Sequence, residues 1–382
     1  MVVKKRMDIT VERSSFITAT QWVKKDTGAN GTWILSIDDN GEGALSAVSP
    51  TGFLTSPFTV TGLGGPKRFS IRVDAPSIMN ALTAINPKSE EPLTLTLEDG
   101  DTLGAAPTGL FLRDRRSRFR IPVLGGSRRS LPDFTVVGSV DGRDFMSLMK
   151  GAHEVTDTRN TARPYFSIIF LTTHRDTLVA TSALANATFM GSCGFTPALG
   201  TNVGVTYGVP ESAVKLWGAL EGYTELLVVP DTGAFGVRTE SGAVSIVNTA
   251  GVKAPDIEGN TAQHVAVPQN SVRVPRGALM KAMGVAKQAA RSESSLLFKV
   301  GDGCLFVADK QKNTVIEVPA CDVTTPTEDG FALNIMVGSR MLKAVHTDEV
   351  LFAYGGMNCY VKPVTGGEVV DTVVVCGKLA KQ

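Results

Sequence analysis

The chain has 382 residues, with 38 Lys and Arg against 37 Asp and Glu, so its formal net charge is only +1. This length allows two or three domains, and a composition of 43% hydrophobic and 20% charged residues is ordinary for a globular protein. The five cysteines are widely spaced, which argues against a zinc ribbon or a disulfide framework. No apolar run reaches the roughly 18 residues of a membrane span. We therefore expect a soluble, cytoplasmic protein that contacts any nucleic acid through locally placed charge.

Short windows with helical spacing of apolar residues recur along the chain in two series. The first series occupies residues 14–25, 143–155 and 276–291. Its apolar markers are Phe16, Phe145 and Leu279. The second series occupies residues 74–87, 210–222 and 338–350, and its markers are Ile78, Val214 and Met341. In both series the markers recur at nearly constant spacing, which indicates an internal repeat.

Strand signals fill the intervals between these windows. Apolar runs joined by a glycine-containing turn predict hairpins at 94–104, 225–239 and 349–363. Longer segments with two apolar runs follow the first helix of each repeat, at 43–60, 176–193 and 303–320. Alternating apolar residues at 69–73 and 271–274 favour half-buried strands.

Three similar units, each about one third of the chain, explain these series, and a period this long means repeated domains rather than a solenoid. Each repeat mixes helices with strands that follow one another, so we predict an α+β fold. The predicted domains are residues 1–134, 135–258 and 259–382.

Five short sequences, in this order, carry a resemblance to a known family. They are MDITVER from Met7, RSRF followed by LPDF before residue 135, TLVAT at 177–181, APD at 254–256, and DTVVVCGKL at 371–379. Together with the triplication, they make the chain resemble a divergent DNA sliding clamp, the β subunit of bacterial replicative DNA polymerase. The resemblance implies three similar domains per chain and two chains closed head to tail into a ring. Helices would line the hole, sheets would form the outside, and the ring would encircle duplex DNA and tether the polymerase as a processivity factor.

The resemblance turns the polar faces of the predicted helices into candidates for contact with DNA. Sliding needs diffuse attraction to phosphates without base readout, and one or two cations per helix suit that need. The alternative is an ordinary solvated helix face. The candidate residues are Lys24, Lys25, Arg143, Lys150, Lys215, Lys287, Arg291 and Lys343.

The family grips a linear peptide of polymerases and clamp loaders in a hydrophobic pocket between the second and third domains. Carried over by motif, the pocket residues are Phe166, Thr181, Pro255, Val373 and Val375. The alternative for each is ordinary core packing. Where the family shows an Asp-Gly-His-Arg-Leu-like run after the strand, this chain has SALAN at 182–186, and residues 259–260 and 375–377 also depart from the family pattern. We therefore expect an altered peptide preference.

Arginines are concentrated between positions 113 and 134, where the chain reads RDRRSRFRIPVLGGSRRSLPDF. The family resemblance places residues 111–121 on an edge strand that closes the ring, with Arg116 and Arg118 as interface charges and Phe119 and Ile121 as apolar contacts. The matching segment of the neighbouring chain, 308–318, offers only Asp309 and Glu317 as acids. Exposed ion pairs contribute little, so we expect backbone pairing and apolar contact to hold the ring.

No motif for chemistry emerges. The four histidines and five cysteines lack ligand spacing, and the glycine-rich segment 61–68 is neither a Walker A loop nor a dinucleotide fingerprint. We expect no enzyme activity, no cofactor and no metal. The expected partners are double-stranded DNA without sequence preference, polymerase and clamp loader, and a second copy of the chain. The alternative is a β-rich structural or assembly protein with triplicated domains and no DNA-tethering role.

Overall fold

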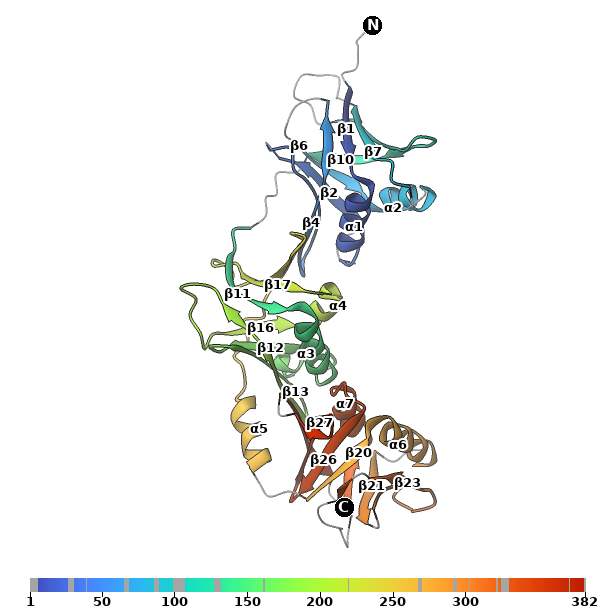
Figure 1. The fold of residues 1–382 in the computed structure, drawn as a ribbon, viewed down its shortest axis with the longest axis vertical. Coiled ribbons are helices and arrows are strands. Elements are labelled where there is room, and N and C mark those ends of the chain that lie inside the picture. The colour runs from blue at the N-terminus through green and yellow to red at the C-terminus, as the bar shows by residue number, and fades with distance from the viewer. Residues whose placement is uncertain are drawn as a thin grey trace. The chain divides into compact units, whose positions relative to one another are not determined.

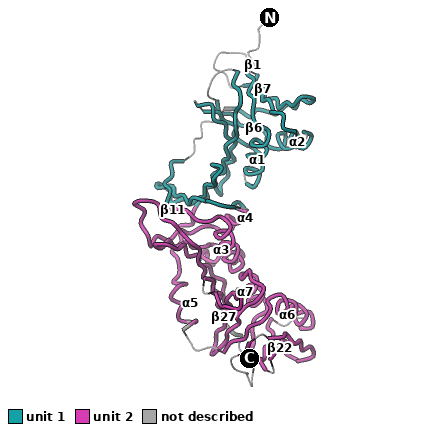
Figure 2. Tube along the Cα trace, viewed as in Figure 1, with its two compact units in different colours: residues 1–137, 215–217, 221–248 teal, residues 138–214, 218–220, 249–382 magenta. Residues whose placement is uncertain are grey.

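The structure is a computed structural model, and the chain divides into two compact units (Figure 2). Unit 1 comprises residues 1–137, 215–217 and 221–248, and unit 2 comprises residues 138–214, 218–220 and 249–382. The structure describes residues 6–26, 31–38, 40–64, 69–85, 89–98, 107–126, 132–160, 162–218, 220–266, 270–290, 294–301, 303–320, 322–323, 330–370 and 372–380.

Within these described ranges, one order of elements occurs three times: a strand, a helix, five strands, a helix and three strands. The first copy comprises β1 (Arg6–Val11), α1 (Arg13–Val23), β2 (Thr32–Ile37), β3 (Gly43–Ser49), β4 (Gly52–Phe58), β5 (Val60–Leu63), β6 (Phe69–Asp74), α2 (Ala75–Ala84), β7 (Leu93–Glu98), β8 (Gly109–Arg113) and β9 (Arg118–Ile121), followed by β10 (Val123–Gly126).

The second copy comprises β11 (Thr135–Asp141), α3 (Gly142–Glu154), β12 (Ile168–Thr173), β13 (Thr177–Leu184), β14 (Ala187–Gly194), β15 (Thr196–Pro197), β16 (Thr206–Pro210), α4 (Ala213–Trp217), β17 (Tyr223–Val228), β18 (Phe235–Thr239) and β19 (Val244–Val247). A 3-10 turn, η1 (Pro164–Ser167), precedes β12.

The third copy follows an additional helix, α5 (Ile257–Ala266). It comprises β20 (Asn270–Pro275), α6 (Arg276–Ala290), β21 (Ser295–Gly301), β22 (Cys304–Ala308), β23 (Val315–Pro319), β24 (Asp322–Val323), β25 (Phe331–Asn334), α7 (Ile335–Lys343), β26 (Glu349–Gly355), β27 (Asn358–Thr365) and β28 (Glu368–Val369), followed by β29 (Val373–Ala380). In this copy the last strand of the repeated order is β29, which pairs with β27 as β19 pairs with β18 and β9 with β8, and β28 is an additional short strand. The predicted α+β class is therefore confirmed, whereas the division into three domains at residues 134 and 258 stays a prediction.

In unit 1, one sheet has the order β5-β1-β7-β8-β9 and a second run has the order β10-β6-β2-β3-β4-β19-β18-β17. Helix α1 packs on β3 and β4 through Phe16, whose ring meets that of Phe58 edge to face with centroids 5.2 Å apart. The Trp22 indole N–H donates to the Val244 carbonyl at 3.2 Å, which ties α1 to β19 as well. Helix α1 thus covers the place where β4 and β19 join.

In unit 2, the strands run in the order β16-β12-β13-β14-β29-β25-β21-β22-β23, and β27 joins β29 to the pair β26·β20. Helices α3, α6 and α7 pack on one face of this sheet, and α5 packs on the opposite face (Figure 1). Neighbouring residues of β13 show the two faces, because side chains alternate along a strand. The Ser182 hydroxyl donates to the Ala152 carbonyl of α3 at 2.7 Å, whereas Ala183 packs against Ile257 of α5.

Two strand pairings join successive copies of the repeat in the same way. Strand β4 of the first copy pairs antiparallel with β19 of the second, and β14 of the second pairs antiparallel with β29 of the third. Strand β23 holds the position of β4 and β14 in the third copy, and β9 holds the position of β19 in the first. Among the described residues, β23 pairs only with β22 and β9 only with β8, so both end their sheets.

The arginine-rich segment forms two short strands rather than the single strand expected over residues 111–121. Strand β8 ends at Arg113 and β9 begins at Arg118. The Asp114 carboxylate accepts from the backbone N–H groups of Arg116 at 2.9 Å and Ser117 at 2.6 Å, which fixes a tight turn. The expectation of an unbroken strand was wrong, because an aspartate side chain that accepts from the backbone N–H groups two and three residues later favours a turn over a strand. Arg116 therefore lies in a turn and not on a strand edge.

Candidate nucleic-acid and partner interfaces

Helix α3 is strongly amphipathic, with Phe145 and Met149 buried and Arg143 and Lys150 exposed. The carboxylate of Asp141 caps its first turn by accepting from the N–H groups of residues 143 and 144, at 2.9 and 3.1 Å. Such a cap satisfies donors that have no partner inside the helix. The sequence thus builds a firmly anchored helix whose exposed face carries the two predicted cations.

Helix α7 packs against both α3 and α6 on the same face of the unit 2 sheet. Lys287 of α6 and Lys343 of α7 are exposed. Arg340 of α7 instead donates to the carbonyls of Glu154, at 3.0 Å, and Thr156. These acceptors lie at the carboxyl end of α3, so Arg340 links α7 to α3. The exposed cations of this layer of helices are Arg143, Lys150, Lys287 and Lys343.

The predicted cations of unit 1 differ from one another in exposure. Lys24 and Lys215 are exposed, whereas Lys25 lies with its ammonium group 4.1 Å from the ring centroid of Trp22. Burial lowers the pKa of Lys25 below its ordinary value. A partly buried cation held over an aromatic ring is less available to a phosphate than a fully solvated one. Arg291, the remaining predicted cation, lies outside the described residues.

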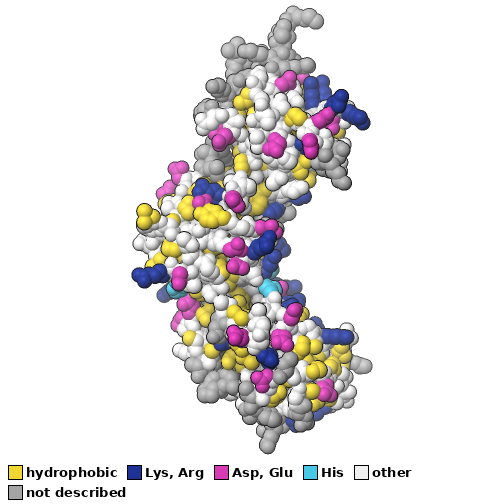
Figure 3. Space-filling model, in the orientation of Figure 1, with side chains coloured by type: hydrophobic (Ala, Val, Ile, Leu, Met, Phe, Trp, Pro, Cys, Tyr) yellow, Lys and Arg dark blue, Asp and Glu magenta, His cyan; other side chains and the backbone are white. Residues whose placement is uncertain are grey.

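The charged surface is mixed rather than uniformly basic. On the face shown in Figure 3, Lys and Arg side chains lie among Asp and Glu side chains. This agrees with the nearly balanced formal charge of the chain. Any attraction to nucleic acid must therefore come from the local placement of cations and not from bulk charge.

The five residues predicted for the peptide pocket do not converge on one surface. Phe166 belongs to a buried cluster with Ala183 and Ile257 on the α5 side of the unit 2 sheet. Thr181 precedes Ser182 by one residue, so its side chain also points to the α5 side.

Val373 and Val375 lie on the opposite side of that sheet. Val375 pairs with Phe189, and Val373 pairs with Gly191, whose position is tightly packed against Leu148 of α3. Paired residues of an antiparallel ladder point to the same face, so both valines face the helix layer of α3 and α7. Val375 is fully buried and Val373 is partly exposed.

The α5 side of the pocket region is already packed by the chain itself. Phe166, Ile168, Phe170, Ala183 and Ile257 form a buried cluster. The segment that leads into α5 adds partly buried apolar side chains to it, among them Val252 and Ala254, and Pro255 is also partly buried. Helix α5 was not anticipated in the sequence.

The residues predicted for ring closure also differ in exposure. Ile121 is only 1% exposed and lies opposite Leu110 in its own sheet, whereas Phe119 is partly exposed. The Arg118 guanidinium lies 3.7 Å from the ring centroid of Phe111 and 3.4 Å from the Glu98 carboxylate. Phe119 is thus the predicted apolar contact that remains open to a neighbour.

The opposing edge, β23, offers one exposed acid. Asp309 is only 2% exposed and accepts from the N–H of Thr314 at 2.6 Å, so it closes its own turn. Glu317 is exposed, and Val315 is 56% exposed. The β23 edge thus combines exposed backbone, an apolar side chain and a single carboxylate.

Among the described residues, no group of three or more His, Cys, Asp or Glu side chains is placed to hold a metal ion. None of the described helices has the length and apolar character to cross a membrane.

Comparison with known proteins identifies the fold. No protein-family model and no curated protein matches the sequence. A DNA polymerase sliding clamp from Pseudomonas aeruginosa superimposes with a TM-score of 0.79 at 13% identity, covering 98% of this chain and 100% of the clamp. A sliding clamp of the same organism, bound to griselimycin, gives a TM-score of 0.77 at 13% identity, covering 99% of this chain and 100% of that clamp. The DNA polymerase III β subunit of Thermotoga maritima gives a TM-score of 0.74 at 12% identity, covering 98% of this chain and 100% of that subunit.

These matches show that the chain has the fold of a DNA sliding clamp along almost its whole length. The fold resemblance inferred from the five short sequences is therefore confirmed. None of the three solved structures named above is an assembly protein of the alternative kind, so they give that alternative no support.

Proposed function

We propose that this protein is a DNA sliding clamp, a ring that encircles duplex DNA and tethers the replicative polymerase as a processivity factor. The repeated strand junction carries the proposal. Strands β4·β19 and β14·β29 join successive copies of the repeat, and the same two kinds of edge, β23 and β9, end the chain's sheets. A contact between unlike edges of identical chains is heterologous, and it closes into a ring when the rotation permits.

The alternation of side chains along each strand supports an antiparallel pairing of β9 with β23 of a second copy. Ile316 and Val318 lie opposite the buried Val307 and Leu305 and thus face the core, as Phe119 and Ile121 do on β9. In the two internal junctions, the core-facing side chains of the paired strands lie on the same face. If β9 and β23 pair in this way, one of the arginines that point away from the core on β9 lies opposite Glu317. Backbone bonds and the two partly exposed core-facing residues, Phe119 and Ile316, would supply most of the closure, since one exposed ion pair is worth little. A dimer is the expected ring.

The exposed cations of α1, α3, α4, α6 and α7 are the proposed DNA contacts. Few and dispersed charges attract phosphates without reading bases, which suits a ring that must slide. The polymerase and the clamp loader are the proposed peptide partners, and the cytoplasm is the proposed compartment. Because α5 and the segment before it pack on Phe166 and Ala183, we expect a peptide preference different from that of the usual family.

The test is topological retention. The protein is loaded with its cognate loader onto nicked circular DNA, and the DNA is then linearised. Rapid release after linearisation, with slow release from the intact circle, is expected of a closed ring. Equal release rates from both DNAs would contradict the proposal, and a monomeric mass in solution would contradict ring formation.

A further inference from the structure

The sheet of unit 1 with the order β5-β1-β7-β8-β9 carries several arginines on one face. Leu112 of β8 and Ile121 of β9 are buried against the core, so the residues that alternate with them point to the other side of the sheet. These residues are at least partly exposed. We call this surface the arginine face, and it consists of Phe111, Arg113, Arg118 and Arg120.

The register of β8 and β9 brings the three arginines close together. Arg113 lies directly opposite Arg118, and Phe111 lies directly opposite Arg120. Opposite residues of an antiparallel pair have their Cα atoms about 5 Å apart, and alternate residues along one strand are about 7 Å apart. Like charges directly opposite each other destabilise a sheet. The arrangement of Arg113 and Arg118 therefore lowers the stability of unit 1 unless an anion lies beside them.

The carboxylates near the arginine face leave two of its arginines without an ion pair. The Arg118 guanidinium lies 3.4 Å from the Glu98 carboxylate. Asp8 of β1 points to the same side of the sheet, but it accepts from the hydroxyl of the threonine opposite it at 2.6 Å. Among the described residues, neither Arg113 nor Arg120 has a carboxylate at ion-pair distance. The Nε atom of Arg113 is buried and donates to no acceptor in the described part of the chain.

The second copy of the repeat has a carboxylate at the corresponding place. Arg238 of β18 corresponds to Arg113 of β8, because each directly follows the last buried residue of its strand. The Nε of Arg238 donates to the Glu225 carboxylate on β17, and the neighbour of Arg238 on β19 is the apolar Val244. The repeat can thus hold an arginine here in a neutral pair. At the two neighbouring places the first copy has Thr94 and Arg118.

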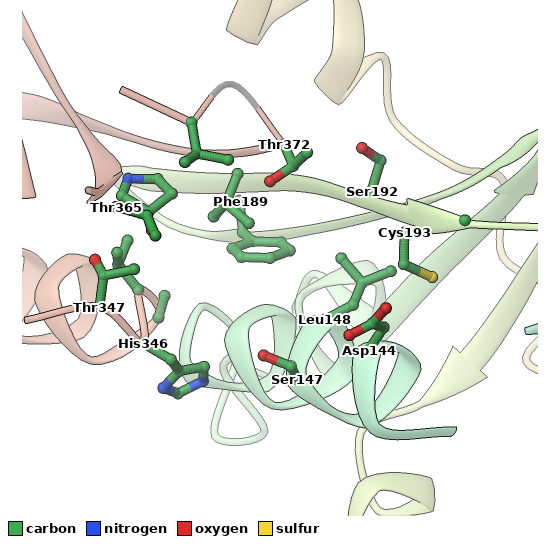
Figure 4. Close-up of a pocket in the computed structure, with 16 residues that line it drawn as sticks. Asp144, Ser147, Leu148, Phe189, Ser192, Cys193, His346, Thr347, Thr365 and Thr372 are labelled. Carbon is green, nitrogen blue, oxygen red and sulfur yellow. The ribbon is translucent and has the colours of Figure 1, made fainter. Parts of the chain in front are cut away.

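Cavities elsewhere in the two units offer an acidic ligand no comparable charge. In unit 2, a cavity of about 410 Å³ lies between α3, β14 and the segment after α7, and Asp144 lines it (Figure 4). In unit 1, a cavity of about 710 Å³ lies beside α1 and β4, and Glu42 lines it. None of the described residues that line either cavity is Lys or Arg. An acidic ligand therefore meets arginines at the arginine face and not in these cavities.

We propose that the arginine face binds an acidic, extended segment of a partner protein with carboxylates at alternate positions. Alternate side chains of an extended segment point the same way and are about 7 Å apart, which is the spacing of Arg118 and Arg120 along β9. Each guanidinium can donate two parallel hydrogen bonds to one carboxylate. Single-stranded nucleic acid fits less well, because it needs an open aromatic ring on which a base can stack. The Arg118 guanidinium lies 3.7 Å from the ring centroid of Phe111 and thus covers that ring.

The proposed site is separate from the proposed ring closure. Pairing of β9 with a second copy uses the backbone at the edge of the strand, whereas the arginine face is the surface of the sheet. When Glu317 of a second copy lies opposite one arginine of β9, Arg113 and the other arginine of β9 still face the partner segment. The proposal therefore depends neither on DNA binding nor on assembly.

The first experiment measures the binding of fluorescent seven-residue peptides to the full-length protein by anisotropy, without DNA. It uses about 0.1 M salt, so that charges more than roughly 10 Å away are screened. One peptide alternates Ser and Glu, and the other has the same composition with its three Glu in succession. The alternating peptide should bind the wild type more tightly, because its carboxylates all point to one side of the extended chain.

The matched variants remove two positive charges each. Arg113→Gln with Arg120→Gln should weaken binding of the alternating peptide about tenfold, since two charge-assisted contacts are lost. The control combines Arg238→Gln with Lys299→Gln, which removes the paired arginine of the second copy and an exposed lysine of β21. This control should bind the alternating peptide as the wild type does.

The second experiment separates binding from folding and from assembly. Arg113→Gln alone should weaken binding without lowering the thermal unfolding midpoint, because it removes a like-charge contact. A purely structural arginine would lower the midpoint. Ile316→Asp changes the β23 edge and leaves the arginine face intact, so it should bind the alternating peptide like the wild type, whatever its oligomeric state.

Five results would each overturn the proposal. They are equal affinity of the two peptides for the wild type, unchanged affinity of the Arg113 and Arg120 double variant, an equal loss in the Arg238 and Lys299 control, a lowered midpoint of Arg113→Gln, and loss of binding in Ile316→Asp. An oligothymidylate that binds more tightly than the alternating peptide, and that the double variant also releases, would assign the arginine face to nucleic acid instead.

Discussion

At the strand junctions, single glycines allow the two strands to approach each other, so a larger side chain is not tolerated at these positions. A Cβ at Gly52 would overlap the carbonyl oxygen of Ile246 and approach the Val247 Cα to 3.1 Å, so β4 reaches β19 only because residue 52 has no side chain. At the corresponding pair in unit 2, Ala187 faces Gly377, and there the glycine is on the other strand. Each junction therefore keeps one glycine at this pair.

We expect Gly52→Ala to destabilise unit 1 by about 1–3 kcal/mol, because the added methyl group must displace backbone. Urea unfolding measured by circular dichroism checks this. The control is Gly284→Ala in α6, where a Cβ meets nothing within 4 Å and where alanine should gain about 0.5–1 kcal/mol of helix propensity. Indistinguishable unfolding midpoints for Gly52→Ala and the wild type would refute the packing argument.

Buried thiols predict a weakness at alkaline pH. Burial raises the pKa of Cys376 to about 12, and it also raises the pKa of Cys359. Above pH 9 the unfolded chain releases thiol protons that the folded chain keeps, so stability falls as pH rises from about 9 towards 12, by up to about 1.4 kcal/mol per pH unit and thiol. The difference in unfolding free energy between Cys376→Val and the wild type should be constant below pH 8 and should shift in favour of the valine variant above pH 9. A difference that stays constant up to pH 10.5 would argue against this reading.

At the scale of elements, local periodicity was enough to locate most helices. The predicted windows 14–25, 143–155 and 276–291 correspond to α1, α3 and α6. Helix α4 is shorter than its window because the chain turns at Gly218, whose φ is +47°. Helix α5 escaped notice because its inward stripe has only three members, Ile257, Thr261 and Val265, and one of them is polar. The signals that could have revealed α5 were this i, i+4, i+8 spacing and Asp256, whose carboxylate accepts from the Gly259 N–H at 2.9 Å.

The functional side chains were harder to predict than the elements that hold them. Motif matching placed Thr181 and Val375 in one pocket, yet strand alternation points them to opposite faces of the unit 2 sheet. It also placed Ile121 at an interface, although the side chain is buried against its own sheet. A motif fixes a residue's position along a strand, whereas the face depends on register and on the partner strand, which one sequence does not reveal.

The edge strands give a prediction about assembly. Phe119→Asp on β9 and Ile316→Asp on β23 should each yield monomers, because each adds a charge to the core-facing apolar contact between the edges. Arg116→Ala should leave the ring intact, because Arg116 lies in the turn before β9. Light scattering after size-exclusion chromatography measures the mass. Ile121→Asp is a poor probe, since Ile121 is only 1% exposed and its loss would unfold β9. A monomeric Arg116→Ala would mean that charge rather than apolar contact closes the ring.

For the whole molecule, the threefold spacing was enough to predict a repeat in which two helices alternate with groups of strands, but not the five strands that lie between the two helices of each copy. The positions of the cations could not be predicted in this way, because a formal net charge of +1 does not say where the cations lie. The structure places Arg143, Lys150, Lys287 and Lys343 on the helices of one layer in unit 2. This arrangement makes the helical layer, rather than the arginine-rich segment, the surface that should determine the salt dependence of DNA retention.

Replacing Arg143, Lys150, Lys287 and Lys343 together by Gln should shorten retention on circular DNA and flatten its salt dependence. Each lost phosphate contact should lower the slope of log affinity against log salt by about 0.9. The control replaces four exposed cations outside these helices by Gln, so that the net charge changes equally: Arg159, Arg175, Lys253 and Lys299. The control should keep the wild-type slope, and both variants should keep the wild-type mass. Equal flattening in both would mean that net charge alone governs retention, and the helical layer would then have no special role in holding DNA.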